Sequence, residues 1–236
     1  MSDIPTFLNM DYLAYGVKSS VSIDLSATAH ILVAGQTGSG KTYATRLLLA
    51  KIAKYQPDAQ ITIVDYKQFD FTDFDDTPRY YGYDTAFVGL QQFNDEFDAR
   101  LSGADKSRNR KILLFDEWSA FMSSLEKKRA DEAKAIIQRL LCLGRAYNVT
   151  CIIGAQKAMA DLFAGGSRDN FGVVILLGNS SKEQRQMLMS DYADDMQTDC
   201  PRGQGYMSIA GRGLYHVLVP QYDQAKADTL IRSAMV

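Results

Sequence analysis

Cysteine, histidine and proline are all scarce in this chain. Its 236 residues include only three cysteines, two histidines and five prolines. Three cysteines cannot all pair, and Cys142 and Cys151 lie in apolar patterns where a thiol behaves as a small hydrophobic group. The small number of cysteines and histidines argues against a zinc site. The prolines are scattered, so they mark no linker between domains.

Long apolar segments are also missing. The longest uninterrupted apolar runs fall far short of the roughly 18 residues that are needed to cross a bilayer. The N-terminus has no basic segment followed by an apolar stretch, which a secretory signal would show. We therefore expect a soluble, cytoplasmic protein with no integral membrane segment. The composition, with 46% hydrophobic and 23% charged residues, suits a single α/β domain.

The chain has no strong charge of one sign. The formal net charge is −2 and the sequence pI is about 5.7, so no global field would draw a single copy onto nucleic acid. Two local basic clusters flank an acidic strand: Lys106, Arg108, Arg110 and Lys111 before it, and Lys127, Lys128 and Arg129 after it. Each cluster is open to two interpretations, a solvated surface or a contact with phosphate.

The strongest motif is a glycine-rich segment between an apolar run and a stretch rich in Leu and Ala. It reads Gly35-Gln36-Thr37-Gly38-Ser39-Gly40-Lys41-Thr42 and matches the pattern G-x-x-x-x-G-K-[ST]. The glycines allow backbone N–H groups to face phosphate, Lys41 would reach the β- and γ-phosphates, and Thr42 offers a hydroxyl to Mg²⁺. The segment therefore predicts that the chain binds ATP or another nucleoside triphosphate with Mg²⁺.

A second motif supplies two adjacent carboxylates. Four apolar residues from Ile112 onward lead directly to Asp116 and Glu117, as in a buried parallel strand that ends at the carboxyl edge of a sheet. Asp116 would hold Mg²⁺ directly or through water, and Glu117 would orient and deprotonate the attacking water. The alternative is that both residues are solvated caps of the following helix.

The hydrophobic pattern predicts alternating strands and helices. We expect strands near 21–23, 30–34, 61–65, 112–116, 149–154, 173–177, 206–209 and 214–219, the last two forming a closing hairpin. We expect helices near 41–55, 91–101, 126–143, 182–189 and 225–235. This order predicts an α/β fold, a P-loop NTPase with a RecA-like, mainly parallel sheet flanked by helices. Residues 1–20 would be an N-terminal arm, and residues 21–236 a single ATPase domain.

Five ordered segments resemble the ATPase core of the FtsK/SpoIIIE and HerA class of DNA translocases. They are His30–Thr42 (HILVAGQTGSGKT), Val64–Lys67 (VDYK), Asp116–Met122 (DEWSAFM), Gly144–Ala146 with Cys151–Gln156 (GRA and CIIGAQ), and Ser180–Arg185 (SSKEQR). The similarity extends from about residue 20 to residue 219. It implies an enzyme that hydrolyses ATP while moving double-stranded DNA, and that assembles as a hexameric ring with sites at its subunit interfaces.

The resemblance also implies roles for three further residues. Gln156 would be the polar sensor of the γ-phosphate, or alternatively an ordinary polar residue at a strand end. Arg185 would be an arginine donated into the neighbouring subunit's site, with Arg145 as the second candidate. Either arginine could instead be an ordinary surface charge. Around DNA, the loop carrying Lys127, Lys128 and Arg129 and the stretch from Lys157 to Arg168 would line the pore.

The chain departs from the family pattern in ways that limit what can be transferred. Lys157 and Ala158 replace the Arg-Pro pair after the sensor glutamine, and Tyr66 replaces a proline. We expect a minimal motor core of a mobile element, a conjugative coupling system or a viral packaging machine. A relaxase, or a secretion or packaging channel, would be a further partner. Two alternatives remain open: a P-loop ATPase that remodels a protein client, and a nucleotide-gated module that recruits a relaxase or secretion channel.

Overall fold

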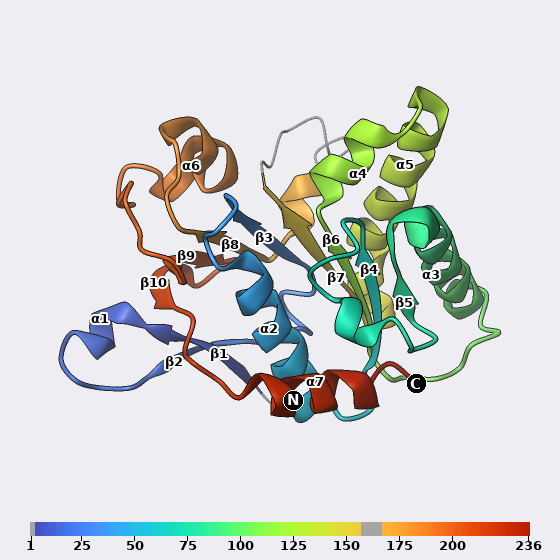
Figure 1. Cartoon of the computed structure of the whole chain (residues 1–236), viewed down its shortest axis with the longest axis horizontal. Helices are drawn as coiled ribbons and strands as arrows, with labels where there is room; N and C mark the ends of the chain where they lie inside the picture. Colours follow the sequence, from blue (N-terminus) through green and yellow to red (C-terminus); the bar gives the residue numbers. More distant parts are fainter. Residues whose placement is uncertain (1–2, 157–166) are drawn as a thin grey trace.

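One mixed sheet forms the centre of the molecule, with helices on both of its faces (Figure 1). The computed structural model describes residues 3–156 and 167–236. The strands are β1 Ile4–Asn9, β2 Ser20–Ile23, β3 Ile31–Gly35, β4 Gln60–Asp65, β5 Tyr80–Tyr81, β6 Lys111–Asp116, β7 Val149–Ala155, β8 Val173–Leu177, β9 Gln204–Ile209 and β10 Gly213–Leu218. Their spatial order is β2-β1-β10-β9-β8-β3-β7-β6-β4-β5.

The sheet has a parallel part and an antiparallel part. Strands β8, β3, β7, β6, β4 and β5 pair in parallel with one another, whereas β9, β10, β1 and β2 are added beside β8 by antiparallel pairing. The predicted α/β fold with a mainly parallel sheet is confirmed, and the predicted closing hairpin is formed by β9 and β10.

Seven α-helices and several short 3₁₀ turns connect the strands among the described residues. The helices are α1 Met10–Leu13, α2 Lys41–Tyr55, α3 Ala86–Leu101, α4 Trp118–Ser124, α5 Lys127–Leu143, α6 Lys182–Leu188 and α7 Gln224–Ser233. The 3₁₀ turns are η1 Thr72–Phe74, η2 Tyr83–Thr85, η3 Gly144–Tyr147, η5 Ser167–Asn170 and η6 Ser190–Tyr192. Within residues 3–156 and 167–236, no helix is long and apolar enough to span a bilayer.

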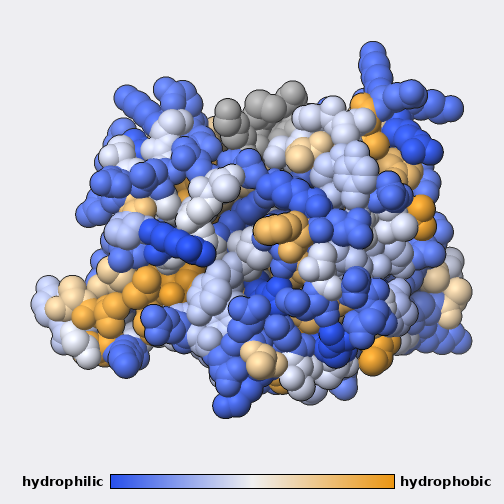
Figure 2. Space-filling model, in the orientation of Figure 1, coloured by the Kyte–Doolittle hydropathy of each residue, from blue (hydrophilic) through white to orange (hydrophobic). Residues whose placement is uncertain are grey.

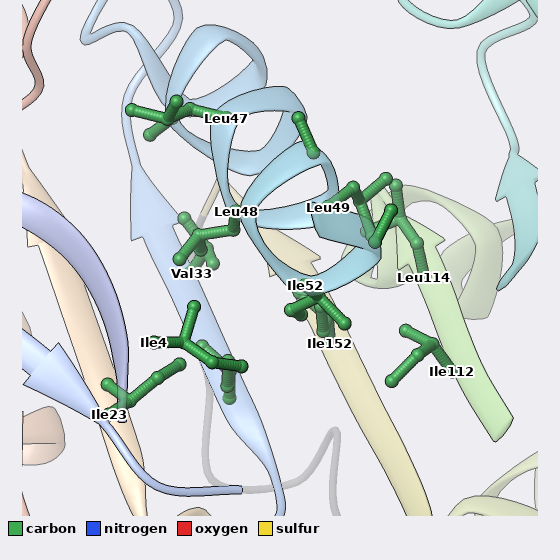
Figure 3. Packing of buried hydrophobic residues seen from close by; sticks show 14 of the residues in the cluster. Ile4, Ile23, Val33, Leu47, Leu48, Leu49, Ile52, Ile112, Leu114 and Ile152 are labelled. Carbon is green, nitrogen blue, oxygen red and sulfur yellow. The ribbon is translucent and has the colours of Figure 1, made fainter. Parts of the chain in front are cut away.

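Alternate residues of the parallel strands supply the two main hydrophobic cores. On β3, Ile31 and Val33 pack with α2 and α7, while Leu32 lies in the core under α3, α4 and α5. Figure 3 shows Leu48 of α2 beside Val33, Ile52 over Ile152, and Leu49 toward Leu114. Burial of each such side chain stabilises the fold by about 1.5–3 kcal/mol. Strands buried on both faces must be apolar at every position, which explains the continuous runs in the sequence.

The described part of the predicted N-terminal arm belongs to the same sheet. Strand β1 pairs with both β10 and β2, and its Ile4 and Phe7 are fully buried. The face shown in Figure 2 is mostly hydrophilic, with a hydrophobic area at the lower left where Figure 1 draws α1 and its neighbouring strands. In this region the side chains of Tyr12, Tyr15 and Val17 are exposed. The segment predicted as an arm therefore contributes an edge of the sheet.

The short helix α1 was not predicted, and helices α3 and α4 differ from the prediction for identifiable reasons. Helix α3 begins at Ala86 instead of near residue 91, because Ala86 and Leu90 continue its buried stripe by one more turn. Helix α4 was not predicted, since it follows Glu117 directly and carries no capping side chain to mark its start.

His30, immediately before β3, is a buried titratable residue that the fold keeps neutral. Its Nδ1 accepts a hydrogen bond from the backbone N–H of Cys151 at 3.1 Å. Burial, with a further contribution from Arg110, lowers the pKa of His30 to about 4. The unfolded chain therefore takes up a proton at a higher pH than the folded protein does.

We predict that His30 makes stability depend on pH between about 6.5 and 4. Its contribution is complete above the unfolded pKa and is lost as the pH falls, amounting to about 2 kcal/mol between pH 7 and pH 5. Chemical denaturation of the wild type and His30→Gln at both pH values measures this difference. The variant should show a smaller pH dependence, and His216→Gln, at the less buried histidine, serves as the comparison. Equal pH dependence in wild type and His30→Gln would contradict the prediction.

Candidate nucleotide-binding site

The predicted phosphate loop joins the end of β3 to the start of α2. Strand β3 ends at Gly35 and the helix begins at Lys41, so the loop lies at the carboxyl edge of the sheet. Gly38 and Gly40 have φ values of 85° and 95°, a left-handed conformation that glycine adopts without a steric penalty. The amino end of α2, with its unpaired N–H groups, faces the same side as the loop.

The loop opens onto a cavity of about 370 Å³. Most residues that line it are polar or charged, which suits a phosphorylated ligand better than an apolar one. The lining residues are Gln36, Thr37, Gly38, Gly40, Lys41, Thr42, Tyr43, Arg46, Lys67, Asp70, Glu117, Gln156, Arg202 and Gln224. Of the predicted phosphate-loop residues, Gly35 and Ser39 lie behind this surface. Gly35 is the last residue of β3, and Ser39 is buried.

The two predicted carboxylates meet the phosphate-loop lysine. Lys41 Nζ lies 2.5 Å from Glu117 Oε1 and 3.6 Å from Asp116 Oδ1, and all three side chains are almost completely buried. The ammonium of Lys41, on helix α2, therefore bridges the two acids at the end of β6. Segments separated by 76 positions in the sequence are joined here by an ion pair.

The side chain of Asp116 fits into the fold only because the residue at position 154, on the adjacent strand, is a glycine. A Cβ atom at Gly154 would lie 2.2 Å from Asp116 Oδ1. Both carboxylate oxygens of Asp116 are buried without a hydrogen-bond partner among the described residues. Burial raises the pKa of Asp116 to about 6, with Lys41 opposing and Glu117 adding to this shift. Buried carboxylate oxygens without a hydrogen-bond partner, together with the hydroxyl of Thr42 at the cavity, are oxygen ligands of the type that Mg²⁺ prefers, so these residues fit the predicted metal.

Glu117 has an unusual backbone conformation. Its φ of 58° and ψ of 42° place a non-glycine residue in the left-handed region, at the cap of α4. Such a conformation costs about 1–3 kcal/mol and occurs often at functional sites. Burial alone would raise the pKa of Glu117, but the nearby ammonium groups of Lys41 and Lys67 outweigh it and lower the pKa. Glu117 is therefore ionised and aimed into the cavity.

Gln156 lies where the resemblance places a sensor. It directly follows β7, which lies between β3 and β6, and it lines the cavity. Its amide Nε2 lies 3.4 Å from Glu117 Oε1. The structure thus brings Lys41, Thr42, Asp116, Glu117 and Gln156 together at one edge of the sheet.

Arg185, predicted to reach a neighbouring subunit, makes its contacts within its own chain in this structure. Its side chain is buried, with 7% of the residue exposed. The guanidinium donates hydrogen bonds to the backbone carbonyls of Ser180 at 3.0 Å and Ala193 at 3.3 Å. Both partners belong to its own chain, and the role in a neighbouring site remains a prediction for this residue.

Arg145 lies elsewhere in the fold. It is exposed in η3, just before β7, and therefore lies at the opposite edge of the sheet from the phosphate loop. The role in a neighbouring subunit remains a prediction for this residue.

Several cavity residues were not singled out from the sequence. Arg202 lies in the turn before β9, where the Gly203 N–H donates to the Ser39 carbonyl at 2.8 Å and connects this turn to the phosphate loop. No sequence pattern marks Arg202. Lys67 belongs to the Val64–Lys67 segment, so a signal was present, but no chemical role was assigned to it. Its Nζ lies 3.0 Å from Glu117 Oε1.

These features define a P-loop protein of the FtsK and HerA class. Residues 12–141 match the family model described as "Helicase HerA, central domain", and the chain belongs to this family. The resemblance inferred from the sequence is thereby confirmed.

Individual relatives agree with this assignment. The chain is 28% identical over 224 residues to the FtsK domain-containing protein YdcQ of Bacillus subtilis, covering 86% of this chain and 46% of YdcQ. It is 24% identical over 206 residues to the DNA translocase FtsK of Borreliella burgdorferi, covering 75% of this chain and 26% of the relative. The chain thus spans less than half the length of these curated relatives.

A solved structure shows the same fold. The ATPγS-bound monomer of the conjugation coupling protein TcpA of pCW3 aligns with a TM-score of 0.75 and 20% sequence identity. The alignment covers 98% of this chain and 70% of TcpA.

We predict that Arg185→Ala lowers stability. The substitution removes a charged donor from two backbone carbonyls in a buried position, a loss of about 1.5–3 kcal/mol. Chemical denaturation provides the measurement, and Arg145→Ala is the matched control because Arg145 is exposed. The control should change stability by less than about 0.5 kcal/mol. Recovery of ATP turnover on mixing Arg185→Ala with Lys41→Ala would instead indicate a role between subunits.

Proposed function

We propose that this chain is the ATP-hydrolysing motor domain of a DNA-translocating assembly. The observation that carries the proposal is the meeting of Lys41, Asp116 and Glu117 beside the phosphate loop. A glycine-rich turn without a ligand would require neither the lysine nor the buried acids. The chain's membership of the HerA family supports the same conclusion.

Each residue of the site has a distinct part in the proposed reaction. The loop N–H groups and Lys41 bind the β- and γ-phosphates of ATP, and Thr42 and Asp116 are the residues that would hold Mg²⁺. When bound, the metal would neutralise charge on the phosphates. Glu117 orients the attacking water and accepts its proton, and Gln156 lies close enough to Glu117 to contact the same region.

DNA is the proposed substrate of the motor. One relative is named a DNA translocase and a structural neighbour is a conjugation coupling protein, which supports the choice of double-stranded DNA. Lys127, Lys128 and Arg129 are exposed in the first turn of α5, the helix after α4. The guanidinium of Arg129 lies 5.2 Å from the centre of the Phe87 ring. This cation–π contact restrains the Arg129 side chain.

We further propose that the chain assembles as a hexameric ring, and that the ring supplies the positive electrostatic field for DNA binding that one copy lacks. With a net charge of −2, DNA binding by a single subunit would depend on local contacts alone, whereas several basic clusters around a pore add together. The stretch 157–168, predicted to line the same pore, lies outside the described residues except for its last two positions. A relaxase, or a secretion or packaging channel, is the proposed partner of such a ring.

Substitutions at Lys41 and Glu117 should have different effects on nucleotide binding. Lys41 would contact phosphate in both the ground state and the transition state, whereas Glu117 acts on the attacking water. We predict that Lys41→Ala weakens both ATP binding and turnover. Glu117→Gln should retain ATP and lose roughly 10²-fold or more in rate, the contribution of a general base.

Nucleotide affinity and kcat of both variants test this assignment. The glutamine variant keeps the size and hydrogen-bonding capacity of Glu117, so a loss of rate reports on the carboxylate itself. Near-normal turnover by Glu117→Gln would remove this residue from the mechanism.

DNA stimulation distinguishes the proposal from its alternatives. We predict that linear duplex DNA increases ATP turnover, and that replacing Lys127, Lys128 and Arg129 with alanine abolishes the increase while basal turnover persists. The affinity for duplex should fall with salt, with a log–log slope of about −0.9 per phosphate contact, and the triple variant should show a flatter slope. The exposed Lys18, Lys54 and Lys226, which lie outside both basic clusters, provide a triple-alanine control with the same change in charge.

The opposite result has a clear meaning. Absence of duplex binding at low salt, in wild-type protein loaded with a non-hydrolysable ATP analogue, would exclude the translocase. Stimulation by a protein client would then favour the remodelling ATPase, and nucleotide binding without turnover would favour the gated module.

A further inference from the structure

The segment Val64–Lys67 has no role in the reaction described above. It lies at the end of β4 and enters the following loop, next to β6. Asp65 is aligned in register with Asp116 of β6, so the segment reaches the same sheet edge as the candidate catalytic acids. Its position raises the question of what Asp65 and Lys67 contribute there.

Asp65 shapes the loop that follows it. Its Oδ2 accepts hydrogen bonds from the backbone N–H groups of Phe69 at 3.0 Å and Phe71 at 2.9 Å. The hydroxyl of Tyr80 donates to the same oxygen at 3.3 Å, and the Gln68 N–H donates to the Asp65 carbonyl at 2.9 Å. A fully buried carboxylate with these partners holds the chain in a tight turn.

The far end of this loop is fixed by packing. Phe71 and Phe74 are fully buried, and the guanidinium of Arg46 lies 5.4 Å from the centre of each ring. Arg46 also donates to the Asp70 carbonyl at 2.8 Å. Since Arg46 belongs to α2, the loop is attached to the same helix that carries the phosphate-loop lysine.

This rigid turn places Lys67 at the cavity. Lys67 Nζ lies 3.0 Å from Glu117 Oε1, the oxygen that Lys41 Nζ contacts at 2.5 Å. The side chain of Lys67 is 39% exposed, whereas those of Lys41 and Glu117 are almost fully buried. Two ammonium groups thus share one carboxylate oxygen, and the more exposed one lines the space where phosphate would enter.

We propose that Lys67 binds the terminal phosphate of a nucleoside triphosphate and leaves Glu117 when it does so. This inference rests on the proposed function, because it requires ATP in the cavity. A triphosphate competes with Glu117 for both lysines, since its terminal group carries more negative charge than one carboxylate. Lys41 turns to the β- and γ-phosphates, Lys67 turns to the γ-phosphate, and Glu117 is released to orient water.

The exchange makes the site selective for triphosphate. A diphosphate has no γ-phosphate for Lys67 to bind. The ion pair between Lys67 and Glu117 therefore persists, and the Glu117 carboxylate is not free to orient water. Lys67 is therefore a residue that distinguishes ATP from ADP, and it connects recognition of the γ-phosphate to the freedom of Glu117.

The test compares the affinities for two nucleotides in the full chain. With Mg²⁺ present, Lys67→Ala should bind a non-hydrolysable ATP analogue roughly tenfold or more weakly, the loss expected for one charge-assisted contact. Its affinity for ADP should be unchanged. Lys67→Arg, which keeps the charge, should recover most of the preference for triphosphate. Lys54→Ala is the control, because Lys54 is exposed at the other end of α2.

Failure of the inference can be separated from failure of the proposed function. Wild type that binds neither nucleotide would contradict the proposed function itself. Normal binding by wild type, with Lys67→Ala either unaffected or weakened equally toward both nucleotides, would overturn only the role of Lys67. Thermal unfolding of each variant shows whether it is folded, and loss of triphosphate preference in a folded Lys67→Ala supports the proposal.

Discussion

Four parallel strands end side by side at the edge of the sheet where the candidate site lies. Their register pairs Ala34 with Ala155, Phe115 with Ile153, and Asp65 with Asp116. Because a shift of one residue would turn every side chain to the other face, the two hydrophobic cores hold this register firmly. This register fixes the relative positions of the site residues, since each functional residue is at or just beyond a strand end.

In the cluster around Glu117, positive and negative side chains contact one another before any ligand enters. Lys41 and Lys67 face Asp116 and Glu117, with two positive and two negative groups in a mostly buried cluster. Buried ion pairs contribute little net stability, because desolvation offsets their attraction. We interpret the cluster instead as a set of exchangeable contacts. An incoming polyphosphate and its metal can replace each internal pair by an external one while every charge remains partnered.

Much of the fold could be predicted from the sequence, because a strand that is buried on both faces has a continuous run of apolar residues. Strand β5 has only two residues, and α4 begins at a left-handed Glu117 without a capping side chain, so neither leaves a recognisable pattern. At the site, the phosphate loop and the two acids could be identified because the reaction requires these residue types at these positions in the sequence. The burial of Arg185 and its hydrogen bonds to the carbonyl groups of Ser180 and Ala193 could not be predicted, since only the tertiary structure reveals these contacts.

The close approach of Gly154 to Asp116 limits how this protein can change during evolution. Any side chain at position 154 would occupy the space of a buried carboxylate on the adjacent strand. Neither residue can be replaced by a larger one unless the other changes first or the strands separate. The two positions should consequently vary together among descendants of this chain, and a lineage that loses the glycine is expected to lose the acid as well.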